Sequence, residues 1–266
     1  MAATVATPTT KPRLNAIVDD VQAALVEIIT RHRVTLDEYR AAVGWLTEAG
    51  RQHLEIPLML DVFLASTLDD VAHAADDGTE CNVEGPVYVP GAPRLERPYV
   101  LPQRDDEPGE KLIFSGTVHS TDGSPLAGAT LDIWQANGAS EYSHFQPGVP
   151  DYNLRGQLTT DDAGAFQFET VVPSAYQIPV AGATGQLLGA LGRSAFRPGH
   201  IHFKLSHPDV APLTTQIYFE DDPWLDSDVV GAVKPSLVTK LARHEDGPSG
   251  PYATGSYDFV LSRRAD

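Results

Sequence analysis

The chain has 266 residues, and its 19 Lys and Arg against 36 Asp and Glu give a formal net charge of −17. This acidic balance argues against nucleic acid or an anionic membrane as a partner, because both attract basic proteins. The single cysteine, Cys81, excludes an intramolecular disulfide framework, and from the sequence we expect no cysteine-based zinc or iron–sulfur site. It also fits a reducing compartment, so we expect a cytoplasmic protein.

The first 80 residues have the periodicity of helices. The stretch from Met1 to Pro12 is rich in Ala, Thr and Pro and lacks a signal-peptide pattern, so we expect a disordered leader without membrane insertion. Residues 14–33 then carry apolar side chains at helical spacing. Thr35 and Glu38 form the capping-box pattern of a second helix ending near Gly50, and a third helix is expected from Pro57 to about residue 76. Residues 1–80 are therefore predicted to be a helical domain.

Beyond residue 81 the period changes to that of strands. A proline-rich passage leads to alternating apolar positions at Leu112, Phe114 and Val118, followed by the Asp122-Gly123 turn. Further short strands with turn signals follow as far as Leu261. Many short strands without intervening helices predict an antiparallel β-sandwich over residues 81–266, so the whole chain is α+β and mainly β.

One of these strands carries a candidate metal-binding pair. After Pro198 and Gly199, the sequence His200-Ile201-His202-Phe203 alternates between polar and apolar residues. Side chains two apart on a strand share a face about 6–7 Å apart along the chain, so the two imidazoles can converge on one metal ion. A lone His-x-His pair is equally consistent with a structural role.

The residues around this pair resemble the intradiol ring-cleaving catechol dioxygenases, and most closely the actinobacterial catechol and chlorocatechol 1,2-dioxygenases. The resemblance covers nearly the whole chain in the same order. The matching stretches are Gly116-Thr117-Val118, Asp132-Ile133-Trp134, Glu141-Tyr142-Ser143, Tyr152-Asn153-Leu154-Arg155-Gly156, Pro173-Ser174-Ala175-Tyr176, Leu191-Gly192-Arg193, Arg197-Pro198-Gly199-His200-Ile201-His202 and Thr214-Thr215-Gln216-Ile217. The chain departs from many members at Gln135, Ser194 and Gly199, and a glycine at 199 is expected to loosen the start of the strand.

The resemblance implies one Fe(III) per chain, with an aromatic diol and O2 as substrates. The iron ligands carried over from the family are Tyr142, Tyr176, His200 and His202. Tyr176 is implied to be the ligand that leaves the iron and takes a proton when the diol binds. Arg197 and Gln216 are implied to stabilise charge on the substrate. Tyr152 lies close to Tyr142 in sequence but does not match the ligand position.

The resemblance also implies a largely apolar pocket for the ring and a homodimer formed through the N-terminal helices, with a possible phospholipid at that interface. The implied pocket residues are Leu58, Asp61, Val62, Val83, Gly85, Val87, Ile178, Pro179 and Val230.

The same residues allow other interpretations. Hydroxyquinol is an alternative substrate class. The stretch from Gly116 to Tyr176 also resembles non-enzymatic transthyretin-like binding modules, and a zinc enzyme could use a His-x-His pair. Neither of the last two accounts for the full set of motifs, and either Tyr142 or Tyr176 alone is more often an ordinary buried tyrosine.

Overall fold

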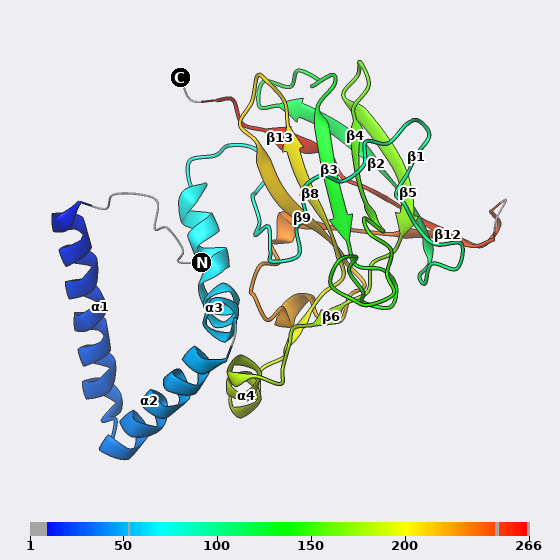
Figure 1. Ribbon diagram of the computed structural model, residues 1–266. Helices are drawn as coiled ribbons and strands as arrows, with labels where there is room; N and C mark the ends of the chain where they lie inside the picture. Colours follow the sequence, from blue (N-terminus) through cyan, green and yellow to red (C-terminus); the bar gives the residue numbers. More distant parts are fainter. Residues whose placement is uncertain (1–9, 53, 248–249, 265–266) are drawn as a thin grey trace. The chain divides into compact units, whose positions relative to one another are not determined.

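The computed structural model describes residues 10–52, 54–247 and 250–264 (Figure 1). The chain divides into two compact units, with the boundary between residues 53 and 54. The predicted boundary at residue 80 is drawn where helical spacing gives way to strand spacing, and it stays a prediction.

The smaller unit contains helices α1 (Lys11–His32) and α2 (Leu36–Arg51). The capping box that begins α2 is confirmed, since the backbone N–H of Thr35 donates to Glu38 at 2.8 Å and that of Glu38 donates to the Thr35 hydroxyl at 3.3 Å. The leader was predicted to extend to Pro12, but α1 already begins at Lys11. Residues 1–9 lie outside the described residues.

Helix α3 (Glu55–Ala72) belongs to the larger unit. The Glu55 carboxylate accepts the backbone N–H of Thr184 at 2.8 Å, and the Ser66 hydroxyl donates to the carbonyl of Gly231 at 3.2 Å. These bonds join α3 to segments more than 120 residues away in the sequence. Among the helices that the structure describes, none is both long and apolar enough to cross a bilayer.

Two sheets form the body of the larger unit (Figure 1). One has the order β1 (Tyr99–Val100), β5 (Ala165–Val171), β2 (Lys111–Ser120), β12 (Tyr252–Ser256) and β11 (Ala242–His244), with β13 (Phe259–Leu261) also on β2. The other has the order β10 (Val238–Thr239), β9 (Leu213–Phe219), β8 (His200–Ser206), β3 (Thr130–Gln135) and β4 (Arg155–Thr159). A short pair, β6 (Tyr176–Gln177) with β7 (Phe196–Arg197), flanks helix α4 (Ala183–Ala190).

Side chains from both sheets meet in one apolar core. Three aromatic side chains are fully buried there: Phe114 of β2, Phe168 of β5 and Phe203 of β8. The ring centroid of Phe114 is 5.8 Å from the centroids of both other rings. Burying each such side chain contributes about 1.5–3 kcal/mol, so this core fixes β8 in the middle of its sheet.

The prediction of a chain that is mainly β with helices at its N-terminal end is confirmed, but the prediction of purely antiparallel pairing is wrong. Both β12 and β13 pair with β2 in parallel, as β1 does with β5 and β10 with β9. Alternation in the sequence shows which face a strand buries but says nothing about the direction of its neighbour. Helix α4 was also missed, because its eight residues include two glycines.

Candidate metal centre

Strand β8 places His200 and His202 side by side at the start of a central strand. Because β8 lies between β3 and β9, His202 is opposite Trp134 on one side and Gln216 on the other, and both imidazoles are buried. Their Nε2 atoms are 3.0 Å apart. Ile201 and Phe203, on the other face, pack in the main core. The strand alternation read from the sequence therefore predicted the orientation of all four side chains.

Neighbouring groups hold each imidazole ring in position. The Nδ1 atom of His200 lies 2.7 Å from the carbonyl oxygen of Pro198, and His202 stacks on the Trp134 ring at 4.5 Å with planes 9° apart. Burial and, to a smaller extent, the positive charge of Arg197 lower the pKa of His200 well below its usual value. Burial and the neighbouring His200 lower the pKa of His202 well below its usual value too. Both rings are therefore neutral near pH 7, and a neutral His200 that donates from Nδ1 has a free lone pair on Nε2.

Tyr142 reaches the same place from the loop that follows β3. The side-chain oxygen of Asn137 accepts the backbone N–H groups of Ala139 and Glu141 at 2.9 and 3.0 Å, which folds this loop back. The Tyr142 hydroxyl is buried and has no hydrogen-bond partner among the described residues. Burial, with a contribution from the neighbouring Tyr176, raises the pKa of Tyr142 well above 10.

Tyr176 comes from strand β6 and is less buried than Tyr142. It pairs with Arg197 of β7, and Arg197 precedes His200 by three residues in the chain. The Tyr176 ring lies edge-on to the Tyr142 ring at 5.5 Å and its centroid is 5.7 Å from that of His200. The four residues implied by the family resemblance are thus brought together, although they come from three separate segments.

The donor set fits a single metal ion. Two nitrogens 3.0 Å apart are at the separation expected of ligands that each bind one ion at about 2.1 Å and roughly at right angles. A buried hydroxyl without a partner costs about 1–3 kcal/mol, and a bond from the Tyr142 oxygen to a cation would remove that cost. Two phenolic oxygens and two imidazoles are donors that suit iron.

A buried guanidinium lies behind the histidines. Arg197 donates to Asp228 at 3.1 Å, to Gln216 at 2.9 Å and to Tyr218 at 3.0 Å, and its Nη1 is 3.4 Å from Nε2 of His200. Burial disfavours its charge, but Tyr218, Tyr176 and Asp228 outweigh burial and raise the pKa of Arg197 well above its usual value. A permanent positive charge therefore lies beside the candidate metal centre.

Gly199 does not loosen the start of β8, as its place in the sequence suggested. Its backbone N–H donates to the Asp222 carboxylate at 2.7 Å, and a Cβ at this position would clash with the carbonyl oxygen of Pro173. The glycine is required because another backbone segment passes close to it.

The predicted pocket residues fall into two groups. Val87 packs against the buried cluster of Trp134, Ala136 and Tyr142. A Cβ on Gly85 would lie 3.8 Å from the His202 ring, and the Val83 carbonyl accepts from Gln216 at 2.5 Å.

The second group forms an apolar cluster beside α4. It contains Leu58, Val62 and Ile178. Val230 is not part of this cluster, although its neighbour Val229 packs against it, and the backbone N–H of Val230 donates to Asp228 at 3.3 Å. Asp61 and Pro179 are exposed, so the structure does not bring them into either group.

Two residues that hold Arg197 and Gln216 were not predicted from the sequence to belong to the site. Tyr218 donates to Gln216 at 2.7 Å, and its position two residues after Gln216 on a strand could have revealed that they share a face. Asp228 lies in a loop 31 residues after Arg197, and no spacing rule connects the two.

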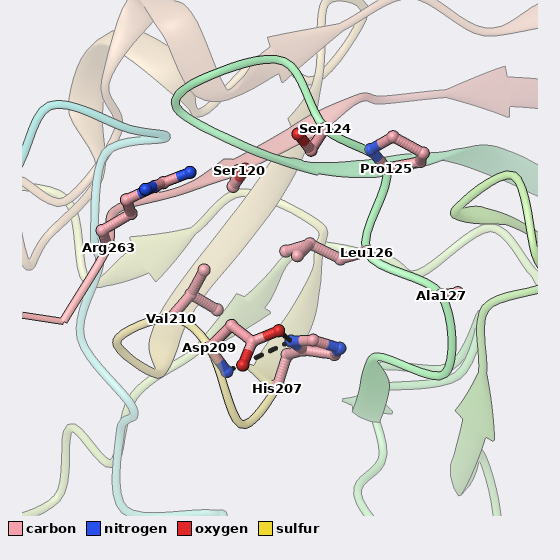
Figure 2. Close-up of a pocket in the computed structure, with 9 residues that line it drawn as sticks. All are labelled: Ser120, Ser124, Pro125, Leu126, Ala127, His207, Asp209, Val210 and Arg263. Atoms are coloured by element: carbon pink, nitrogen blue, oxygen red, sulfur yellow. Dashed lines mark hydrogen bonds and ion pairs between the residues drawn. The ribbon is translucent and has the colours of Figure 1, made fainter.

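A groove of about 540 Å³ lies elsewhere, at the opposite end of β8 (Figure 2). It is lined by Ser120 at the end of β2 and by His207, which follows the last residue of β8 and faces Asp209. None of the predicted site residues borders it.

Comparison with known proteins identifies the class that this fold and site define. Residues 83–263 match the family model described as "Dioxygenase", and residues 11–80 match the one described as "Catechol dioxygenase N terminus". The chain therefore belongs to the intradiol ring-cleaving dioxygenases.

Individual relatives differ in their substrates. The chain is 40% identical to a chlorocatechol 1,2-dioxygenase of Rhodococcus opacus, over 94% of this chain and 97% of that protein. It is 34% identical to a catechol 1,2-dioxygenase of Acinetobacter baylyi (96% and 87% covered) and 37% identical to a hydroxyquinol 1,2-dioxygenase of a Rhizobium species (95% and 90% covered). The crystal structure of 3-chlorocatechol 1,2-dioxygenase from Rhodococcus opacus 1CP superposes with a TM-score of 0.89 at 43% identity, covering 96% of this chain and all of that one.

Proposed function

We propose that this dioxygenase cleaves catechol and substituted catechols with O2 to cis,cis-muconates, at one ferric ion held by Tyr142, Tyr176, His200 and His202. The observation that carries the proposal is the convergence of two neutral imidazoles, 3.0 Å apart, with a buried tyrosine hydroxyl that lacks a partner. When bound, ferric iron would supply a Lewis acid that binds the diol and makes its ring reactive toward O2.

The two tyrosines are suited to different roles. Tyr142 is enclosed and its loop is held by Asn137, so it serves as a fixed ligand. Tyr176 is partly exposed on a two-residue strand, so its side chain is free to turn away and hold at its hydroxyl a proton released by the diol. Arg197, oriented by Gln216 and Asp228, stabilises negative charge on the bound substrate.

The function is tested by measuring iron content, colour and oxygen uptake with catechol, 4-methylcatechol, 3-chlorocatechol and hydroxyquinol. We expect a reddish protein with one iron per chain that consumes O2 with the first three diols. A colourless active zinc protein would refute the metal assignment. A preference for hydroxyquinol would support the alternative substrate class, and a colourless protein without turnover would support a binding module.

Replacing Tyr176 by Phe is expected to leave some iron bound, shift the visible absorption and lower kcat by at least about 10²-fold, as loss of a general base does. Tyr152→Phe is the matched control. The Tyr152 hydroxyl donates to the carbonyl of Pro90 at 3.1 Å and its ring packs on His144, so it has partners other than the candidate ligands. A bleached Tyr152→Phe variant beside a coloured Tyr142→Phe variant would contradict the ligand assignment.

The substituent preference is expected to depend on Val87, which packs against the cluster that contains the candidate ligand Tyr142. All candidate substrates share the same diol group, so discrimination among ring substituents must come from side chains at the ring edge. Val87→Phe should lower kcat/KM for a substituted catechol about tenfold more than for catechol, because a methyl-sized clash costs about 1–2 kcal/mol. Val100→Phe, at a half-exposed position on β1, is the control. Equal losses of kcat/KM for both substrates in Val87→Phe would show that Val87 does not line the pocket.

We further propose that the chain forms a homodimer through its N-terminal helices. In α1 no residue is buried within the described chain, and large apolar side chains along it are about half exposed. A second copy, or a phospholipid bound at the same surface, would cover them. Light scattering at micromolar concentration should give twice the chain mass of 28.7 kDa, and a monomer mass would rule out this assembly.

A further inference from the structure

A second group of potential metal ligands lies at the end of helix α3, apart from the candidate iron centre. Asp69 and His73 are four residues apart and so share one face of the helix end, where His73 is the C-terminal cap. Cys81 approaches from the segment that leads to the first sheet. One ligand atom from each of Asp69, His73 and Cys81 lies within 4.8 Å of the other two.

The contacts within this group leave donor atoms available. The Oδ2 atom of Asp69 is buried without a hydrogen-bond partner among the described residues. The His73 Nδ1 atom is 2.9 Å from the backbone carbonyl oxygen of Asp69 and 3.5 Å from the other carboxylate oxygen, so the second ring nitrogen, Nε2, is the one left for a metal. The buried Cys81 sulfur is 3.7 Å from the same carbonyl oxygen. A buried carboxylate oxygen with no partner is costly in a protein, so this group is incomplete as it stands.

We propose that Asp69, His73 and Cys81 bind a thiophilic divalent cation such as Zn²⁺ or Cd²⁺, with water as a fourth ligand. The mixture of thiolate, imidazole and carboxylate is typical of such ions. Bonds of about 2.0–2.3 Å would bring the ligand atoms roughly an ångström closer together than 4.8 Å, which rotation of the partly exposed His73 and Asp69 side chains can provide.

Charge and proton balance are consistent with this site. Binding replaces the thiol proton, which leaves to water, so the cation meets one thiolate, one carboxylate and a neutral imidazole and the sum is zero. Burial raises the pKa of Cys81 to about 12. Below that pH each binding event releases one proton, and the apparent affinity should rise about tenfold per pH unit.

The site would connect α3 to the support of the iron centre. Cys81 directly precedes Asn82, whose side chain donates to the carbonyl of Ala232 at 2.6 Å, and Val83, which accepts from Gln216. Lys234 donates to the Cys81 carbonyl at 2.9 Å and pairs with Asp70 of α3 at 2.5 Å. Lys234 therefore already links the segment around Cys81 to α3.

The test is a titration of the purified full-length protein with Cd²⁺, followed by the ultraviolet thiolate-to-cadmium charge-transfer absorption. Cys81 is the only cysteine, so this absorption reports on the proposed site alone, whatever metal occupies His200 and His202. We expect one thiolate-bound Cd²⁺ per chain, displaced by Zn²⁺, and an affinity that rises with pH.

Variants distinguish a site with three protein ligands from binding to the cysteine thiol alone. Cys81→Ser should abolish the absorption, and His73→Ala and Asp69→Asn should each weaken binding by at least about tenfold. His244→Ala, at an exposed histidine on β11, should bind as the parent protein does. Thermal unfolding without Cd²⁺ identifies any variant that is misfolded. No charge-transfer absorption at saturating Cd²⁺, or undiminished affinity in both folded His73→Ala and Asp69→Asn, overturns the proposal.

Discussion

Replacing His202 by Ala is expected to remove the iron, the visible colour and turnover together. His202 supplies one of two nitrogens that lie 3.0 Å apart, and its ring is stacked on Trp134, so no neighbouring side chain can take its place. Loss of a group that merely orients a ligand costs about 10–100-fold in metal affinity, and loss of the ligand itself should cost more. His200→Ala should behave in the same way.

The matched control is His207→Ala, because His207 follows the same strand at its far end and contacts Asp209 instead. This variant should retain iron and colour. Iron content is measured by elemental analysis and turnover by oxygen uptake. Stoichiometric iron in His202→Ala would contradict its place in the centre, and loss of iron in His207→Ala would show that any disturbance of β8 has this effect.

The sequence predicted the local parts of this site well. The alternation in His200-Ile201-His202-Phe203 fixed which side chains face the core, and the Thr35–Glu38 pair located the start of α2. Each of these features depends on residues within four positions of one another. The convergence of Tyr142 and Tyr176 on the histidine strand depends on pairings between distant segments, so only the family resemblance suggested it.

Other features could not be read from the sequence for the same reason. The parallel pairing of β12 with β2 depends on where a strand re-enters the sheet after more than 100 intervening residues. The close backbone approach at Gly199 depends on Pro173, and the placement of α3 depends on Glu55 meeting Thr184. Such contacts leave no periodic signal in either segment.

The buried ion pair between Arg197 and Asp228 gives the largest expected effect on stability. Their side chains are only 4% and 2% exposed, and Asp228 also accepts the backbone N–H groups of Val230 and Ala232 at 3.3 and 2.9 Å. Removing one partner of a buried pair leaves an uncompensated charge, so Asp228→Ala should lower the free energy of unfolding by about 3–5 kcal/mol. It should also lower kcat, because Arg197 is no longer held beside His200.

An exposed pair provides the control. Asp221 pairs with Arg243 at 2.8 Å, but the two side chains are 65% and 49% exposed, so Asp221→Ala should cost at most about 1 kcal/mol. Urea unfolding of the variants in parallel measures the difference. If Asp228→Ala and Asp221→Ala are equally stable, pairing with Asp228 does not stabilise the buried charge of Arg197.

A double variant distinguishes loss of an ion pair from simple loss of packing. If the cost of Asp228→Ala comes from the unpaired guanidinium, then Arg197→Met combined with Asp228→Ala should be more stable than Asp228→Ala alone, because both charges are gone. It should nevertheless be inactive while retaining its iron, since the four candidate ligands are intact. A double variant that is less stable than Asp228→Ala would show that packing around Arg197, rather than its charge, maintains this part of the fold.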